Sequence, residues 1–372
     1  MQADFIIIGS GMAGMSAAYR LSKHGKVIVL EKESLLGYHT TGRSAAFFTE
    51  NYGNKTIRAI TKASRYFLEN PPPCFKENEL MTNYGGSLFI ANKDQSSHID
   101  KELEYASSLS ANVFEISIKE ALEMVPIIRE NYIDRALHEP DSKAMDVDLI
   151  HQGFARGLKS NNGKIIFNAE VNKIDKINQD WKVSTKTDDF FAPIIINAAG
   201  AWCDEVAILA GCKPLGLIPK RRTVIIFEHS ENINTSNWPV VIDVEDNFYF
   251  KSEAGKILAS PADETDSFPC DAQPEEIDIA MTVARIEEAT NFKIKKIDHK
   301  WAGLRSFFSD RTPTVGEDPL VSNFYWLAGQ GGYGIQTAPG ISKIIECLIV
   351  GKKWPSYLSD LKIYPETLLS NR

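Results

Sequence analysis

The sequence is poor in cysteine and has no long hydrophobic run. Its five cysteines are scattered, odd in number and never spaced as CxxC, which argues against a disulfide framework and against a zinc site. No apolar run approaches the roughly 18 residues of a membrane helix. The apolar stretch after Asp4 is also too short for a signal peptide. We therefore expect a cytoplasmic protein with no membrane span and no metal site.

The chain also lacks an excess of positive charge. Lys and Arg number 41 against 49 Asp and Glu, a formal net charge of −8, so nucleic acid is not an expected partner. The composition, 43% hydrophobic and 24% charged, is that of an ordinary globular protein. A length of 372 residues is enough for about two domains.

A glycine-rich motif near the N-terminus predicts a dinucleotide site. Residues 4–9 form an apolar run, Gly9–Gly14 matches GxGxxG, and a helical pattern follows and stops near Gly25. A second apolar run, Val27–Leu30, ends at Glu31. In such a unit the glycines permit a tight turn, close approach of a pyrophosphate and close helix packing, and the terminal acid binds ribose hydroxyls. The acid favours FAD or NAD over NADP. The alternative is a glycine-rich turn in an ordinary α/β domain.

The remaining patterns predict alternating helices and strands, followed by a β-rich region between residues 214 and 301. Helices are expected at 54–70, 98–109, 117–124, from a cap at Asp148 to about Leu158, at 274–289, and finally up to about Val350. Strands are expected at 84–91, 164–171, 181–185, 194–200, 222–227, 240–242, 248–251, 257–259, 292–297 and 324–328.

Three further segments extend the dinucleotide pattern. Gly37–Ser44 ends in Gly-Arg-Ser, Asn197–Gly200 ends a buried strand in small residues, and Gly329–Thr337 places four glycines before a helix. The positive N-terminal end of that helix can stabilise negative charge on a ligand. Together these segments resemble those of the FAD-dependent amino acid oxidoreductases of the D-amino acid oxidase and glycine oxidase superfamily.

This resemblance implies non-covalently bound FAD and a two-part fold. It implies an α/β FAD-binding Rossmann-like domain of the glutathione-reductase type, formed by residues 1–82, 146–213 and 302–372. An antiparallel α+β substrate domain would be inserted as residues 83–145 and 214–301. The residues that the resemblance assigns to FAD are Gly9, Gly11, Met12, Ala13, Gly14, Glu31, Lys32, Arg43, Ser44, Ala45, Ala46, Val171, Ala199, Gly200, Trp202, Gly331, Gly332, Tyr333, Gly334, Ile335, Gln336 and Thr337.

Two arginines are expected to bind a substrate carboxylate, for which a guanidinium is a planar bidentate clamp. Arg305 lies in the string GLRSFF, and Arg222 begins an expected strand. Arg221 is the rival of Arg222, because strand alternation puts the two on opposite faces. The alternative for Arg305 is a structural arginine paired with a nearby acid.

Within the superfamily, the chain resembles the bacterial FAD-dependent D-arginine dehydrogenases over nearly its whole length. The shared strings are TGRSAA at 41–46, NAAGAWCD at 197–204, PKRR at 219–222, WAGLRSF at 301–307 and QGGYGIQT at 330–337. The resemblance implies that the carboxylate, side chain and amine of the substrate are met by Arg222, Arg305, Tyr52, Tyr249, Phe47 and Gly332.

Two departures from that group bear on the substrate. Phe47 stands where the group has a histidine, and Gly86 stands on or beside the position of a glutamate that pairs with the substrate guanidinium. Glu77 and Glu79 are nearby candidates for the missing acid. A buried guanidinium without a counter-charge is costly. A neutral or hydrophobic substrate is therefore expected rather than D-arginine.

The expected reaction is oxidation of the Cα–N bond of a D-amino acid, with hydride transfer to FAD N5. The imino acid then hydrolyses to a 2-oxo acid and ammonia, and no side chain is required as acid or base. The alternatives are a glycine- or sarcosine-type amine or a 2-hydroxy acid on the same scaffold, or a non-catalytic flavin-binding protein. The residues leave open D against L chirality, the oligomeric state, and whether the electron acceptor is a quinone, another acceptor or oxygen.

Other conspicuous polar residues are given plainer interpretations. His39 is expected to be a polar loop residue rather than a flavin attachment point, and His151 to be packed or on the surface. Cys203 is expected to be a buried apolar residue rather than a nucleophile. The acidic stretch 243–246 is expected to be a solvated loop rather than a metal site.

Overall fold

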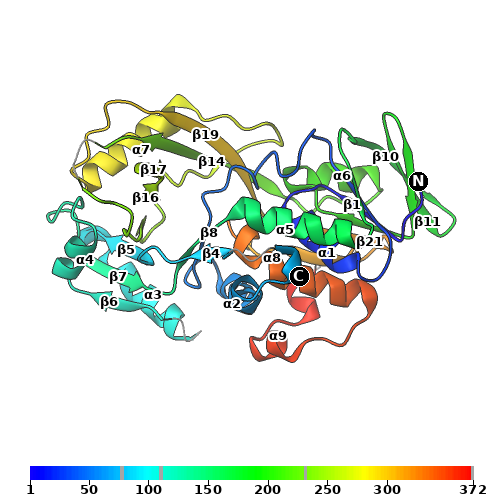
Figure 1. Ribbon diagram of the computed structural model, residues 1–372, viewed down its shortest axis with the longest axis horizontal. Coiled ribbons are helices and arrows are strands. Elements are labelled where there is room, and N and C mark those ends of the chain that lie inside the picture. The colour runs from blue at the N-terminus through cyan, green and yellow to red at the C-terminus, as the bar shows by residue number, and fades with distance from the viewer. Residues whose placement is uncertain (76–78, 109–111, 230–232, 370–372) are drawn as a thin grey trace.

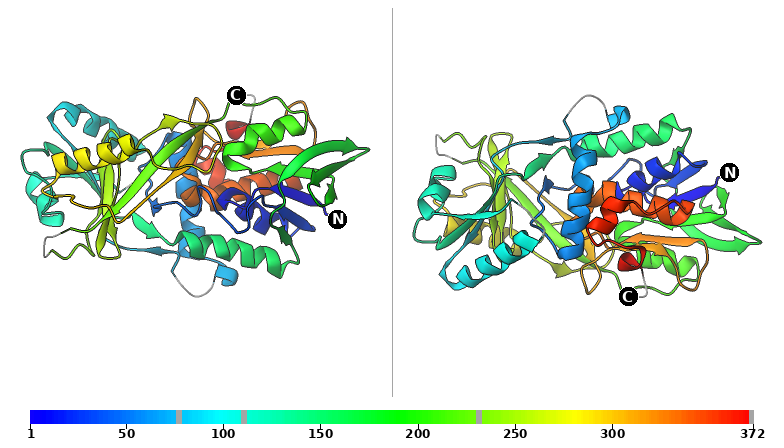
Figure 2. Two further views of the ribbon diagram at one scale, coloured as in Figure 1. Left: turned by 90° about the horizontal axis from the view of Figure 1, so that it is seen from above. Right: turned by 90° about the horizontal axis from the view of Figure 1, so that it is seen from below.

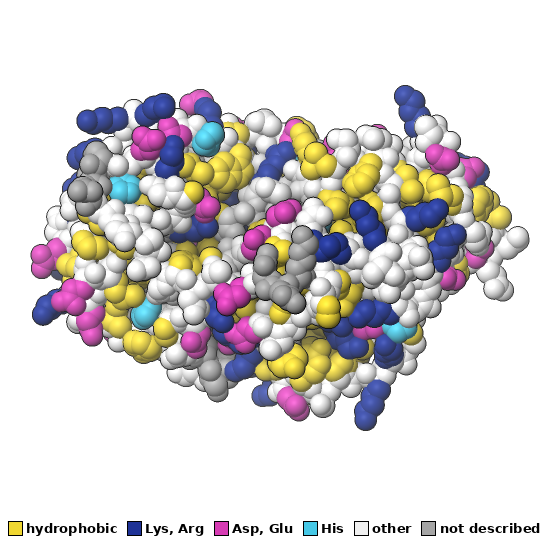
Figure 3. Space-filling view, viewed as in Figure 1, with side chains coloured by type: hydrophobic (Ala, Val, Ile, Leu, Met, Phe, Trp, Pro, Cys, Tyr) yellow, Lys and Arg dark blue, Asp and Glu magenta, His cyan; other side chains and the backbone are white. Residues whose placement is uncertain are grey.

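The computed structural model describes residues 1–75, 79–108, 112–229 and 233–369. Figure 1 shows an elongated molecule with two lobes, and the two turned views in Figure 2 show the same division. We call the lobe around β1 the Rossmann lobe and the lobe around β14 the β lobe. Figure 3 shows positive and negative side chains mixed on both lobes of the visible face.

A parallel sheet forms the centre of the Rossmann lobe. Its strands, in spatial order, are β20 (Thr314–Glu317), β21 (Phe324–Ala328), β13 (Ile194–Asn197), β1 (Phe5–Ile8), β2 (Val27–Leu30) and β9 (Lys164–Ile166). Only β20 pairs antiparallel with its neighbour. Alternate residues of β1 enter different apolar clusters, Phe5 and Ile7 on one face and Ile6 and Ile8 on the other. Both faces of the sheet are thus buried, as continuous apolar strands predict.

Helices cover one face of this sheet and a second small sheet covers the other. The first face carries α1 (Met12–Leu21), α5 (Val147–Ser160) and α8 (Gly334–Val350), with α2 (Lys55–Glu69) packed on α8 and α9 (Ser356–Asp360) beyond it. The opposite face carries β10 (Val171–Ile177), β11 (Asp180–Thr185), β12 (Asp189–Ala192) and α6 (Cys203–Leu209).

The β lobe is built on a large, mainly antiparallel sheet. Its strands, in spatial order, are β18 (Thr265–Asp266), β14 (Ile218–Phe227), β17 (Lys256–Ser260), β16 (Tyr249–Glu253), β15 (Val240–Asp243), β5 (Ser87–Ala91), β7 (Arg135–Glu139) and β6 (Phe114–Ile116), and β19 (His299–Phe307) also pairs with β14. The helices of this lobe are α3 (Ser96–Ser108), α4 (Ile118–Met124) and α7 (Glu276–Ala289). The pair β5–β15 is parallel, so the sheet is mixed rather than purely antiparallel.

Another three-stranded sheet lies where the chain passes between the lobes (Figure 1). It consists of β3 (Phe47–Phe48), β8 (Lys143–Met145) and β4 (Met81–Thr82). Short 3₁₀ turns complete the described elements, namely η1 (Pro73–Phe75), η2 (Lys93–Gln95), η3 (Gly200–Trp202) and η4 (Pro365–Leu368). No helix in the described ranges has both the length and the apolar character that a membrane crossing needs.

Two expectations for the middle of the chain are wrong. The cap of α5 is Asp146 rather than Asp148, since the Asp146 side chain accepts a hydrogen bond from the Leu149 backbone N–H at 2.8 Å. The single strand expected at 164–171 is split between β9 and β10, which belong to different sheets. Asn168 has a positive φ of 53° and turns the chain between them.

Two strand expectations in the β lobe also need correction. The stretch 292–297 joins no ladder, and its Ile294 N–H instead donates to the Glu287 carboxylate at 2.7 Å. The strand expected from residue 84 begins only at Ser87 (β5), because Gly85 and Gly86 both have positive φ. The ladder that follows 292–297 is β19, which continues to Phe307 and passes the domain boundary expected after residue 301.

One buried carboxyl group joins the end of β7 to the chain after β3. Glu139 is 2% exposed, and its two carboxyl oxygens accept hydrogen bonds from the Thr49 hydroxyl at 2.5 Å and the Glu50 backbone N–H at 2.8 Å. Burial raises the pKa of Glu139 to about 7. Its proton is thus held more tightly in the folded protein than in the unfolded chain.

This shift predicts a stability that falls as the pH rises. Between about pH 4.5 and 7 the native state keeps a proton on Glu139 that the unfolded chain has lost, so unfolding releases that proton and is favoured by higher pH. Glu139→Gln removes this effect. Relative to wild type, we expect the variant to gain about 2–3 kcal/mol of unfolding free energy between about pH 5 and pH 8.5. Urea denaturation at both pH values measures this gain, and an equal difference at the two would contradict it.

Candidate functional site

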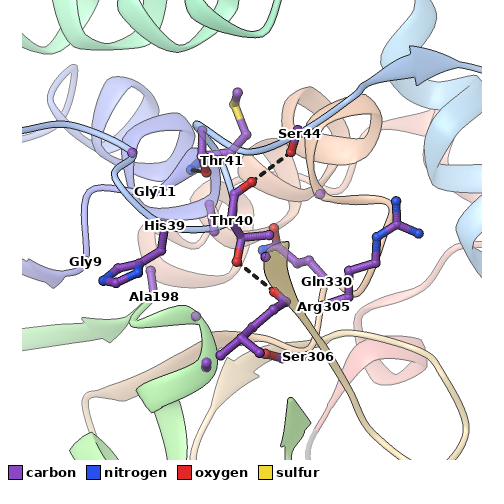
Figure 4. Close-up of a pocket in the computed structure, with 18 of the residues that line it drawn as sticks. Gly9, Gly11, His39, Thr40, Thr41, Ser44, Ala198, Arg305, Ser306 and Gln330 are labelled. Carbon is purple, nitrogen blue, oxygen red and sulfur yellow. Dashed lines mark hydrogen bonds between the residues drawn. The ribbon is translucent and has the colours of Figure 1, made fainter. Parts of the chain in front are cut away.

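A large cavity lies between the lobes, beside the carboxyl ends of β1, β13 and β21. Figure 4 shows it surrounded by the N-terminal loops, the segment after β21 and the residues of β19. Ligands of open α/β sheets bind at this edge of the strands. The segments that line it include residues 8–13, 37–47, 169–171, 198–202, 303–306 and 327–332.

The three glycines of the GxGxxG motif have separate roles. Gly9 has a φ of 102°, and a Cβ on it would lie 2.4 Å from the Ala198 carbonyl oxygen. A Cβ on Gly14 would lie 1.9 Å from the Gly9 carbonyl oxygen, so these two glycines allow β1, α1 and β13 to meet. A Cβ on Gly11 would meet only the Thr41 hydroxyl oxygen, at 3.4 Å, and Gly11 lines the cavity.

Two helices begin at the cavity wall without a cap from the side chain of their own N-cap residue, although the Met12 N–H of α1 donates to the Thr41 hydroxyl at 3.0 Å. Met12 is the first residue of α1 and lines the cavity, and Gly334 is the first residue of α8 and lines it too. Gln330 also lines the cavity, and its amide nitrogen is buried without a hydrogen-bond partner among the described residues. Free N–H groups and positive helix ends make this wall a site for phosphate and for a polar ring edge.

Glu31 is a prearranged acceptor at the end of β2. One carboxylate oxygen accepts from the Ser10 backbone N–H at 2.8 Å and from the Ser10 hydroxyl at 2.6 Å, and the other accepts from the Glu33 N–H at 2.9 Å. Beside it, the Lys32 ammonium lies 3.4 Å from the centre of the Trp202 ring. Glu31, Lys32 and Trp202 all line the cavity, as the sequence predicts.

Arg43 lines the cavity, but its guanidinium is bound to groups of the β lobe. The guanidinium donates to the carbonyl oxygens of Ala272 at 2.9 Å and Ala302 at 3.0 Å and pairs with Asp271. The Thr40 hydroxyl donates to the Leu304 carbonyl oxygen at 2.7 Å (Figure 4). Arg43 therefore ties the N-terminal loop to the β lobe.

Most residues assigned to the cofactor by sequence meet in this one cavity. Those that line it are Gly9, Gly11, Met12, Ala13, Glu31, Lys32, Arg43, Ser44, Ala45, Ala46, Val171, Ala199, Gly200, Trp202, Gly331, Gly332, Gly334, Ile335 and Gln336. Gly14, Tyr333 and Thr337 lie behind its wall. The Tyr333 ring packs 4.9 Å from the ring of Tyr52, and the Thr337 hydroxyl donates to the Tyr333 carbonyl oxygen at 2.8 Å.

The six residues expected to meet a substrate also line the cavity, namely Arg222, Arg305, Tyr52, Tyr249, Phe47 and Gly332. Arg305 donates to the Tyr52 hydroxyl at 3.2 Å and forms no ion pair within the described part of the chain. A Cβ on Gly332 would lie 2.8 Å from the Arg305 guanidinium, so glycine allows the two to pack closely. Arg305 is thus a positive charge available to an anionic ligand.

Arg222, and not its neighbour Arg221, faces the cavity. Arg222 is buried and pairs with Glu264 at 3.2 Å, and its Nε has no hydrogen-bond partner among the residues described. Arg221 points the other way and pairs with Glu275 at 2.5 Å and Asp278 at 2.9 Å. Strand alternation therefore separates them as expected.

In the acidic stretch 243–246, Glu245 and Asp246 are exposed, as expected, but Asp243 is buried, which corrects the expectation for that residue. Asp243 is 1% exposed and accepts hydrogen bonds from the N–H groups of Glu245 and Asn247. Asp246 lines the cavity that Arg222 and Arg305 also line. Burial raises the pKa of Asp246, and the two arginines oppose that rise. The acidic stretch is conspicuous in the sequence, but Asp246 was not assigned to the substrate site, although its place three positions before Tyr249 was a usable signal.

The glutamate missing at Gly86 has no substitute among the described residues of that part of the chain. A Cβ on Gly86 would lie 2.4 Å from the Glu139 carbonyl oxygen, so no side chain fits there. Glu79 is exposed and does not line the cavity, and Glu77 lies outside the described residues. The carboxylate that lines the cavity together with the residues expected to meet the substrate is instead that of Asp246.

The other singled-out residues have structural surroundings. The His39 ring lines the cavity and lies 2.8 Å from Glu33, and its burial lowers its pKa. His151 is buried, and its Nε2 lies 2.8 Å from the Ser10 carbonyl oxygen. Burial raises the pKa of the Cys203 thiol, so this cysteine is inert, as expected. Across the described ranges, no group of three or more metal-ligating side chains is arranged around a common point.

Comparison with known proteins agrees with this geometry. Residues 4–348 match the family model described as FAD dependent oxidoreductase, and the chain belongs to that family. It is 24% identical to the uncharacterized oxidoreductase YurR of Bacillus subtilis, over 94% of this chain and 95% of that protein. It is 25% identical to human mitochondrial dimethylglycine dehydrogenase, over 97% of this chain but only 44% of that protein.

The fold is shared with solved structures as well. The crystal structure of glycine oxidase from Geobacillus kaustophilus has a TM-score of 0.83 and 17% identity, and the match covers 97% of this chain and 98% of that one. The protein is therefore an FAD-dependent oxidoreductase of the D-amino acid oxidase type, which acts on a small substrate and passes electrons to an acceptor.

The residues of the cavity fit FAD. Gly11 leaves room for a pyrophosphate at the start of α1, and Glu31 can accept ribose hydroxyls. Gln330 and the first turn of α8 form the remaining wall of the cavity, where they would offer hydrogen-bond donors to the flavin ring. Bound there, FAD supplies the oxidising group of the reaction.

The two glycines of α1 predict opposite phenotypes. Gly14→Ala places a Cβ against the Gly9 carbonyl, and we expect it to cost about 2 kcal/mol or more of folding stability. Gly11→Ala meets nothing closer than 3.4 Å, so it should fold normally but bind FAD about tenfold or more weakly by blocking the pyrophosphate. Thermal denaturation and FAD titration by fluorescence separate these effects. Wild-type FAD affinity in Gly11→Ala would contradict the assignment.

Proposed function

We propose that this enzyme oxidises the Cα–N bond of a small D-amino acid to the imino acid, which hydrolyses to a 2-oxo acid and ammonia. The observation that carries the proposal is Arg305, a guanidinium at the cavity that has no carboxylate partner within the described chain. A buried cation of this kind is stabilised when it binds an anion. The carboxylate of an amino acid meets that need with two parallel hydrogen bonds.

The surrounding residues can orient such a substrate. Arg222 lines the same cavity, so its guanidinium can add a second contact to the carboxylate. Tyr52 accepts a hydrogen bond from Arg305 and holds the guanidinium in place. The Gly332 carbonyl is available to the substrate amine. Positioning of this kind supplies much of the rate without an acid or base.

The first turn of α8 assists the reaction electrostatically. Its uncapped N–H groups and positive dipole end lie at the cavity wall through Gly334, Ile335 and Gln336. Negative charge that develops on the cofactor side during hydride transfer is stabilised there. We further propose that FAD is held without a covalent bond, since the His39 ring nitrogen is already engaged by Glu33.

The apolar Phe47 supports the expected preference for neutral or hydrophobic side chains. Its ring packs 6.3 Å from that of Tyr249, and together they form an apolar wall. The other premise of that preference, a site without any carboxylate, no longer stands, because Asp246 lines the cavity. Glycine or a sarcosine-type amine is the second candidate, favoured by the similarity to proteins named glycine oxidase and dimethylglycine dehydrogenase.

A substrate panel tests the proposed function directly. Anaerobic holoenzyme is mixed with D- and L-amino acids, glycine, sarcosine and 2-hydroxy acids, and the loss of oxidised flavin absorbance is followed. We expect rapid reduction by neutral D-amino acids, because their carboxylate and amine match Arg305 and Gly332. Reduction by L-amino acids alone, by sarcosine alone or by hydroxy acids alone would overturn the D-amino acid assignment.

The carboxylate clamp predicts the effect of shortening Arg305. Arg305→Lys keeps the charge but loses the planar fork, so we expect kcat/KM to fall about 100-fold, mainly through KM. Arg221→Lys is the matched control, since Arg221 neighbours Arg222 on β14 and does not line the cavity. Steady-state kinetics on both variants measure the difference. Equal losses in the two would show that the Arg305 effect is structural.

A further inference from the structure

Asp246 is a carboxylate of the substrate cavity that the proposed function does not use. It lies in the turn between β15 and β16, and its side chain is open to the cavity rather than packed in the protein. Within the described part of the chain, its carboxylate accepts no hydrogen bond and forms no ion pair. A charged group left unpaired at a partly enclosed site is a candidate for ligand binding.

The turn that carries Asp246 is held firmly. The buried Asp243 carboxylate accepts from the N–H groups of Glu245 at 3.0 Å and Asn247 at 3.1 Å, and from the Gln95 side chain at 2.9 Å. Asp246 itself has a positive φ of 57° and donates its N–H to the Asp243 carbonyl oxygen at 2.9 Å. Aspartate and asparagine adopt this left-handed conformation more readily than other side chains. The cavity carboxylate therefore has a defined position.

Three charged side chains line the part of the cavity where the substrate is expected, namely Arg222, Arg305 and Asp246. Glu264 pairs with Arg222 and with Arg311. Arg305 and Asp246 remain, one positive and one negative, and both line the same cavity. Two unpaired charges of opposite sign match a ligand that carries an anionic and a cationic group.

We propose that Asp246 binds the protonated nitrogen of the substrate while Arg305 binds its carboxylate, so that the cavity selects zwitterionic or cationic amino acids over 2-hydroxy acids. The proposal rests on the proposed function for its carboxylate end. The nitrogen is either the α-ammonium, which passes one proton to the Asp246 carboxylate before the hydride leaves Cα, or a cation further along the side chain, and both use the same charge-assisted hydrogen bond. A hydroxy acid offers Asp246 no cation, and its own negative charge is repelled there.

Three ligands of nearly equal size separate these cases. D-Norleucine carries only the α-ammonium, D-lysine adds a distal ammonium, and D-2-hydroxyhexanoate has neither.

Two variants test the role of the carboxylate. Asp246→Asn keeps the shape of the side chain and tolerates the left-handed backbone. Glu245→Gln is the matched control, because it removes a negative charge from the same turn at a residue that does not line the cavity. The apparent Kd of each amino acid comes from the concentration dependence of anaerobic flavin reduction in the holoenzyme. The Kd of the hydroxy acid comes from calorimetry.

We expect Asp246→Asn to weaken amino acid binding about tenfold or more and to tighten hydroxy acid binding about threefold or more, with Glu245→Gln close to wild type. Equal weakening for D-norleucine and D-lysine assigns the contact to the α-nitrogen, and weakening for D-lysine alone assigns it to the distal nitrogen. Unchanged affinities, or equal weakening of all three ligands, would overturn the proposal.

Failure of the proposed function has a different signature. If neither amino acid reduces the wild-type flavin, the amine reaction is wrong. The hydroxy acid arm still decides the role of Asp246, because a cavity carboxylate must repel an anion whatever reaction follows. Tighter hydroxy acid binding in Asp246→Asn, but not in Glu245→Gln, would then support charge selection. Unchanged binding would refute it.

Discussion

The close meeting of β1, α1 and β13 is the constraint on which the rest of the structure depends. It rests on two backbone contacts that tolerate no side chain, Gly9 against Ala198 and Gly14 against the Gly9 carbonyl. Because these contacts bring the start of α1 to the sheet edge, the free N–H groups of the helix reach the cavity. The cofactor wall is therefore a result of backbone packing rather than of particular polar side chains.

The second half of the cavity is brought to this wall by polar contacts between the lobes. Arg43 binds carbonyl groups of the β lobe, the Thr40 hydroxyl binds the Leu304 carbonyl, and Glu139 holds the chain that follows β3. Each contact joins segments that are far apart in sequence and uses a buried or partly buried donor. Such bonds are costly to leave unmade, so they set how the lobes meet and where Arg305 stands relative to α8.

The charge pattern at the substrate end follows from that placement. Glu264 pairs with both Arg222 and Arg311, while Arg305 hydrogen-bonds only to the Tyr52 hydroxyl within the described chain and Asp246 keeps its carboxylate free. A cavity with separated unpaired charges is unfavourable in itself and is stabilised by a ligand of complementary charge. The same arrangement that would weaken an empty protein thus provides affinity and selectivity for an amino acid.

Local chemistry alone determined the Rossmann unit and the orientation of the arginines. The βαβ motif, the terminal Glu31 and the glycine turn before α8 depend on neighbouring residues, and strand alternation placed Arg221 and Arg222 on opposite faces of β14. Tertiary structure decided the rest. Asp246 and Arg305 line one cavity, and Arg43 pairs with Asp271, only because segments far apart in the chain pack together. A sequence pattern records spacing along the chain, whereas the pairing of charges depends on distances through space.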